Sequence, residues 1–256
     1  MLPPPRLRKR LIVNLVTGED YPVSLAINGT YIYWTNNNTG KIRRSLLDGT
    51  GAVDLRTGEV SPWGIAVNAT YIYWTLPNTN KIRRALLDGT GAAVDLITGE
   101  AAYIGEIAVN ATYIYWADGS TIRRATLAGG SKTTLVTSAS VYGPAINGTY
   151  IYWGTYTTPD TIKRALLAGT GTTTLVTGEP YSPISLTVDG TYIYWTNITS
   201  GNIRRSLLDG TGAVDFAIGE NSPCGVAVDA NYIYWTAVGD GGNGNGSIRR
   251  MPLALS

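Results

Sequence analysis

The chain has 256 residues, of which 15% are charged and 10% aromatic, and its formal net charge is +2. Its many glycines (31), tyrosines (17) and tryptophans (7) favour a turn-rich β protein and argue against disorder. With one cysteine, Cys224, and no histidine, the chain cannot form an intramolecular disulfide, a thiolate metal cluster or a histidine-activated nucleophile.

The first residues combine basic side chains with a short apolar stretch that is interrupted by Asn14. A secretory apolar region needs at least about seven such residues and a membrane span about twenty. We therefore expect a soluble chain without a membrane span.

A repeat begins soon after this segment. The string YIYW starts six times, at spacings of 37 to 42 residues: Tyr31, Tyr71, Tyr113, Tyr150, Tyr192 and Tyr232. A fixed period of this length is typical of repeat architectures. In the first copy, AINGTYIYW predicts two strands joined by a tight turn at Asn28 and Gly29. The segments IRRSLL and AVDL, separated by DGTG, predict two more strands, so each repeat is a four-stranded meander, A to D.

The YIYW strand is apolar and bulky on both faces. Tyr31 and Tyr33 point to one face, while Ile32 and Trp34 point to the other. Both faces of such a sheet must be covered, and neighbouring copies of the same sheet provide the cover when six of them stack around an axis. The sequence therefore predicts an all-β, six-bladed β-propeller of four-stranded antiparallel blades, with residues 1–256 as a single domain.

The two ends of the sequence predict how the ring closes. After the sixth YIYW the chain supplies a C strand, SIRRMPL, and no D strand follows. The segment Leu11 to Glu19 matches the D-strand text at Thr172 to Glu179. We expect Leu11 to Val16 to pair with Ile248 to Leu253 as the outer strand of the last blade, which leaves no long free sheet edge at the seam.

The order P-x-G-[IV]-A-V, Y-I-Y-W-T and I-R-R-x-L-L-D-G resembles the YWTD repeats of low-density-lipoprotein-receptor class B propellers, which are six-bladed. The resemblance implies a receptor-like or scaffold domain that binds ligands on one face. One departure is systematic, because only Asp118 keeps the aspartate of the motif. If that aspartate ties neighbouring blades together, these blades are expected to be held mainly by packing.

The basic residues of the repeat could form a nucleic-acid surface or pair with acidic residues. Because the chain is nearly neutral, we expect them to pair between blades with Asp54, Asp95 and Asp215, and we expect no nucleic-acid partner.

Six aromatic residues lie outside the repeated positions. They are Tyr21, Trp63, Tyr103, Tyr142, Tyr156 and Tyr181. Five stand in loops from strand D to the next strand A, and Tyr156 stands in a B-to-C loop; in a meander both kinds of loop emerge on one face. These loops vary among copies while the opposite turns do not, which is typical of a binding face. We expect the ligand there, with Trp63 and Tyr142 as leading anchors and the carboxylate of Glu106 near the channel mouth. Alternatively, the aromatics only cap the ends of the blades.

These features favour a non-catalytic recognition module that binds a glycan or a protein segment, with no cofactor and no metal. The alternatives are a propeller enzyme of the lactonase or lyase kind and a structural or engineered repeat scaffold. Asp240, Asn243 and Asn245 could suggest calcium, but their spacing favours a flexible insertion. The sequence leaves the oligomeric state open and favours an extracytoplasmic or secreted location.

Overall fold

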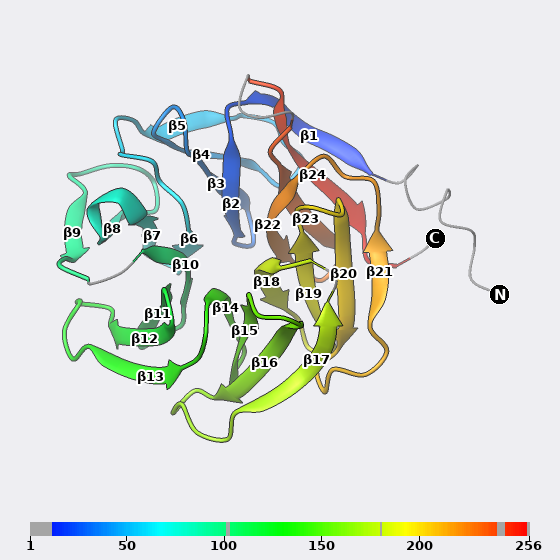
Figure 1. Ribbon diagram of the computed structural model, residues 1–256. Coiled ribbons are helices and arrows are strands. Elements are labelled where there is room, and N and C mark those ends of the chain that lie inside the picture. Colours follow the sequence, from blue (N-terminus) through cyan, green and yellow to red (C-terminus); the bar gives the residue numbers. More distant parts are fainter. Residues whose placement is uncertain (1–11, 101–102, 180, 240–243, 255–256) are drawn as a thin grey trace.

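The computed structural model describes residues 12–100, 103–179, 181–239 and 244–254. Six four-stranded antiparallel sheets form a ring in which strand A of each repeat lies at the centre and strand D at the rim (Figure 1). This confirms the predicted six-bladed propeller. No helix in these ranges is long and apolar enough to cross a membrane.

The blades are numbered in chain order. Blade 1 contains β2 (Pro22–Ile27), β3 (Tyr31–Asn36), β4 (Lys41–Leu46) and β5 (Val53–Arg56). Blade 2 contains β6 (Ile65–Val67), β7 (Tyr71–Leu76), the short 3-10 helix η1 (Pro77–Thr79), β8 (Lys81–Leu86) and β9 (Val94–Ile97). Blade 3 contains β10 (Ile104–Val109), β11 (Tyr113–Asp118), β12 (Thr121–Thr126) and β13 (Thr133–Thr137).

Blade 4 contains β14 (Val141–Ile146), β15 (Tyr150–Thr155), β16 (Asp160–Leu166) and β17 (Thr173–Glu179). Blade 5 contains β18 (Pro183–Val188), β19 (Tyr192–Asn197), β20 (Asn202–Leu207) and β21 (Val214–Ala217). Blade 6 contains β22 (Pro223–Val228), β23 (Tyr232–Ala237), β24 (Gly246–Pro252) and, as its outer strand, β1 (Val13–Glu19).

The ring closes through β1 as expected. Val13 pairs with Arg250 and Val16 with Ile248 in antiparallel register. The apolar side chain of Leu15 also packs against the cluster between blades 6 and 1. The described part of β1 therefore completes blade 6, while Leu11 lies outside the described residues.

The core lies between the blades and is built from the YIYW strands. In each copy the tryptophan and the second tyrosine are the largest fully buried side chains. Trp34 packs toward blade 6, whereas Tyr33 packs toward blade 2. The alternation of side chains along the strand thus covers both faces of every sheet, as the sequence predicts.

The blades are joined by a buried polar network in addition to the packing that the sequence predicts. Glu59, at the end of blade 1, accepts hydrogen bonds from the indole N–H of Trp74 (3.0 Å) and from Arg83 (2.8 Å), both in blade 2. At the seam, Glu19 in β1 binds Trp34 and Arg43 of blade 1 in the same way. Equivalent buried glutamates stand at three more junctions: Glu100, Glu179 and Glu220.

The aspartates predicted to bridge blades do not do so. Asp54 binds Arg43 (2.7 Å) across the β4–β5 pair of a single blade, and Asp95 and Asp215 repeat this contact with Arg83 and Arg204. Their position directly opposite the arginine on the neighbouring strand dictates this pairing. The bridge to the next blade comes from the glutamates instead.

Candidate functional site at the channel mouth

Six residues at one repeat position, at or just before the start of the inner strands, surround the mouth of the central channel. They are Val23, Trp63, Gly105, Tyr142, Ile184 and Cys224. Val23 and Cys224 are buried together, with Trp63 and Ile184 packed against them. Gly105 has no side chain, so the mouth is open on the side of blade 3.

A cavity of about 320 Å³ occupies this open side. Its lining consists of Trp63, Tyr103, Gly105, Glu106, Gly119, Ser120, Ser140, Val141, Tyr142, Gly143 and Ile184. These residues come from the starts of inner strands, from the loops that precede them and from the β11–β12 loop. The cavity thus lies on the face where the D-to-A and B-to-C loops emerge, and its size is in the usual range for small-ligand sites.

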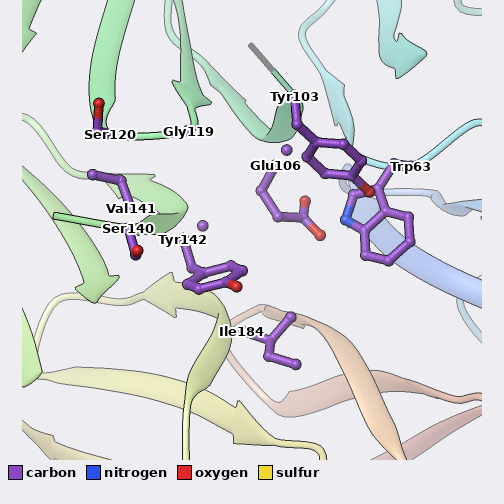
Figure 2. Close-up of a pocket in the computed structure, with 11 residues that line it drawn as sticks. Trp63, Tyr103, Glu106, Gly119, Ser120, Ser140, Val141, Tyr142 and Ile184 are labelled. Atoms are coloured by element: carbon purple, nitrogen blue, oxygen red, sulfur yellow. The ribbon is translucent and has the colours of Figure 1, made fainter. Parts of the chain in front are cut away.

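Aromatic rings form two sides of the cavity. Trp63 and Tyr103 meet edge to face with ring centroids 6.0 Å apart. Tyr142 stands opposite them in Figure 2 and meets Tyr156 edge to face at 6.5 Å. Tyr156 is 62% exposed and supports Tyr142 from outside the cavity lining. The structure thus brings Trp63, Tyr103, Tyr142 and Glu106 together.

The other two predicted aromatics lie apart from this cavity. Tyr21 packs beside Val23 and Cys224, and Tyr181 is 42% exposed; neither belongs to the cavity lining.

Glu106 projects from β10 into the space between the aromatic rings (Figure 2). One carboxyl oxygen accepts a 2.8 Å hydrogen bond from the hydroxyl of Ser24, and the other has no partner among the described residues. The Ser24 oxygen in turn accepts the backbone N–H of Ile65 (3.3 Å). Burial raises the pKa of Glu106 to about 7, an effect that the Ser24 hydrogen bond partly offsets. Near neutral pH the carboxyl group is therefore present both with and without its proton.

Glu106 of blade 3 contacts Ser24 of blade 1 across blade 2. The contact is possible because Gly64 of blade 2 has no side chain. A side chain at Gly64 would bring its Cβ within 2.8 Å of the Glu106 Cα atom. The neighbouring groups respond to the same buried environment. Burial, followed by the charge of Glu106, raises the pKa of Tyr103 to about 12 and raises the pKa of the Cys224 thiol. Both groups stay protonated near neutral pH.

Sequence reasoning missed several parts of this site. Ser120 and Ser140 contribute hydroxyl groups to the lining, and Gly119 and Gly143 contribute backbone. The two serines stand in the loops predicted to carry specificity, and that placement was the available signal. Ser24 gave no comparable signal, because its role depends on an approach between strands from different blades.

The raised pKa predicts a pH-dependent stability. Unfolded Glu106 loses its proton near pH 4.5, while folded Glu106 keeps it until about pH 7, so the folded state binds more protons between these values. This contribution is complete below about pH 4.5 and is lost as pH rises through about 7. A difference of about two pKa units corresponds to about 3 kcal/mol.

Glu106→Gln keeps the shape of the side chain and removes the titration. We expect the variant to melt several degrees above the parent protein at pH 8 and at nearly the same temperature at pH 4, in thermal unfolding followed by circular dichroism. An identical pH profile for the two proteins would contradict the assignment.

The described residues contain no group of three or more cysteine, aspartate or glutamate side chains placed to hold a metal ion. Asp240 and Asn243 of the proposed flexible loop lie outside the described residues.

Comparison with known proteins defines the fold further. No protein-family model and no curated protein matches the sequence. Among solved structures, a gluconolactonase from Xanthomonas campestris superposes with a TM-score of 0.80 at 14% identity, covering 95% of this chain and 89% of that chain. A chain of a nidogen/laminin complex gives 0.72 at 20% identity over 81% and 85% of the two chains. Virginiamycin B lyase from Staphylococcus aureus gives 0.66 at 18% identity over 91% and 80%. The propeller fold is therefore shared with enzymes and with a chain of the nidogen/laminin complex.

Proposed function

We propose that the protein is a recognition module that binds one sugar ring of a glycan in the cavity at the channel mouth. The observation that carries the proposal is the combination, in about 320 Å³, of two aromatic sides with a buried carboxyl group that has one unpartnered oxygen. The flat C–H face of a sugar packs well against Trp or Tyr, and its hydroxyl groups need polar partners at fixed points.

The polar groups of the cavity suit this ligand. Glu106 accepts a hydrogen bond from a sugar hydroxyl when ionised and can donate one when protonated. Ser120 and Ser140 add hydroxyl groups on the side away from Trp63 (Figure 2). Glycines at 105, 119 and 143 leave backbone atoms accessible in the lining. An apolar side chain of a protein segment between the aromatic rings would leave the Glu106 oxygen without a partner, whereas a sugar ring presents both an apolar face and hydroxyl donors, so we favour the sugar.

Binding is expected to depend on the aromatic sides of the cavity. Trp63→Ala and Tyr142→Ala should each lower the affinity for the glycan at least tenfold, because removal of an aromatic anchor commonly costs about 2 kcal/mol or more of binding free energy. The melting temperature should shift little. A glycan array with purified protein identifies the ligand, and isothermal titration calorimetry then measures the variants.

Tyr181→Ala is the matched control, because Tyr181 is an exposed aromatic of the same kind of loop and lies outside the cavity lining. Its affinity should equal that of the parent protein. Unchanged binding by the Trp63 and Tyr142 variants would overturn the proposed site, and capture of a peptide in place of any glycan would reassign the ligand class.

A second candidate function is catalysis of a lactonase or lyase reaction. One observation favours it, namely the buried Glu106 carboxyl with a pKa of about 7, which is suited to general acid–base chemistry. Turnover of a lactone panel that is lost in Glu106→Gln would support this candidate. Glycan binding without turnover would favour the recognition module.

A further inference from the structure

The junction between blades 3 and 4 lacks the carboxylate that the other five junctions supply. The backbone N–H of Glu59 donates to the carbonyl of Gly40, and that of Glu220 donates to Gly201 in the same way. At the corresponding place, the N–H of Ser138 donates to the carbonyl of Ser120 (2.8 Å). Ser138 therefore stands where the other junctions have glutamate.

The groups that bind the glutamate elsewhere are still present in blade 4. Trp153 is fully buried, packs toward blade 3, and its indole N–H has no acceptor among the described residues. Lys163 lies directly opposite Trp153 on the neighbouring strand, where each of the other five blades has an arginine that binds the glutamate. Residues paired in this way project from the same face of the sheet. A cationic side chain and an unused N–H therefore face the position of the missing carboxylate.

Two hydroxyl groups complete the same face. In blade 1 the amide of Asn36 donates to Glu19 beside Trp34. In blade 4 the equivalent residue is Thr155, whose buried hydroxyl binds that of Thr161 at 2.7 Å. This exchange of amide for hydroxyl keeps the surroundings polar although no glutamate is present to require it.

An indole N–H without an acceptor also occurs at the junction between blades 2 and 3, where the glutamate is present. The indole N–H of Trp116 also lacks an acceptor, yet Glu100 is present there and binds Arg123 and Lys132. At the junction of blades 3 and 4 the carboxylate itself is absent, and no ion pair engages Lys163 in the described part of the chain.

We propose that the junction of blades 3 and 4 is a binding site for a small carboxylate, held by the indole N–H of Trp153 and the ammonium group of Lys163. Serine differs from glutamate at this position by the atoms of one carboxylate group, which formate or acetate can supply. A hydrogen bond and an ion pair to such an anion satisfy the two groups that glutamate satisfies elsewhere. This site differs from the cavity at the channel mouth, because neither Trp153 nor Lys163 lines that cavity.

The test follows the tryptophan indole N–H signals by ¹⁵N–¹H NMR while sodium acetate is added at constant ionic strength, with sodium chloride as the reference titration. Trp153→Phe assigns the Trp153 signal. We expect that signal alone to move in a saturable way at millimolar acetate, and Lys163→Met to weaken the response at least fivefold. Benzoate distinguishes two sources: a site for free small anions takes acetate alone, whereas a site for the carboxylate end of a larger ligand takes both.

Ser138→Glu is the decisive variant, because it restores the side chain found at the other junctions. We expect it to place the Trp153 signal near the acetate-saturated position, to abolish the response to acetate and to raise the melting temperature. If the Trp153 signal does not move with acetate in the parent protein, or if the response persists in a folded Ser138→Glu variant, the proposal is wrong.

Discussion

Removal of residues 1–17 is expected to lower the melting temperature by several degrees or more, or to cause aggregation. The deletion takes away most of β1, which pairs with β24 from Val13 onward and packs Leu15 against the cluster between blades 6 and 1. Because Glu19 is retained, the deletion tests the strand pairing and the Leu15 packing, and it does not remove the side chain that contacts blade 1. The exposed edge of β24 would then present unpaired N–H and C=O groups to other molecules.

Thermal unfolding and size-exclusion chromatography measure both effects, at about 2–4 °C per kcal/mol for a chain of this size. Removal of residues 1–10, which precede β1, is the control and should change neither result. Equal melting temperatures for the 1–17 deletion and the parent protein would show that the closure by β1 does not stabilise the ring.

Glu59→Ala is expected to destabilise the protein by about 2–4 kcal/mol, which corresponds to a fall of roughly 10 °C in melting temperature. The substitution leaves the buried indole N–H of Trp74 without its acceptor and leaves Arg83 without its buried partner. The indole N–H stays shielded from water and finds no new acceptor, whereas Arg83 is partly exposed and keeps its ion pair with Asp95.

Asp95→Ala is the matched control, since Asp95 binds the same Arg83 from the exposed side at 2.8 Å. An exposed ion pair contributes at most about 1 kcal/mol, so this variant should melt within a few degrees of the parent protein. Chemical denaturation gives the free energies of unfolding directly. If the two variants prove equally stable, the glutamate does not hold blades together.

Most of the fold could be predicted from the sequence because the repeat is local. YIYW alternation and Asn-Gly turns concern neighbouring residues and predict the blades. The closure follows from a direct match of sequence text, since Leu11 to Glu19 repeats a D strand. The glutamate network was missed although Glu59 and its counterparts recur at one repeat position. The partners of each glutamate lie in the next blade, and strand alternation alone cannot show which acidic side chain binds residues of a neighbouring blade.

The candidate site was predictable only in part for a similar reason. Trp63 and Tyr142 stand at the start of an inner strand, so they point to the channel mouth. Tyr21 and Tyr103 both stand two positions earlier in their repeats, yet only Tyr103 lines the cavity. The residue at the channel mouth in the same repeat decides whether the tyrosine meets the cavity. Gly105 leaves space beside Tyr103, whereas the buried side chain of Val23 packs against Tyr21. Such a difference depends on packing around the whole channel mouth.

The closure through β1 determines where the chain could begin and end without a change in the ring. Val13 and Arg250 are paired neighbours, and Glu19 joins blade 6 to blade 1 with the same contacts that Glu59 makes between blades 1 and 2. The backbone break therefore lies inside blade 6, between β24 and β1, while the boundary between blades 6 and 1 keeps the contacts of an ordinary blade boundary. The ring has no obligatory first blade, and circularly permuted chains that open in a different surface loop would specify the same architecture.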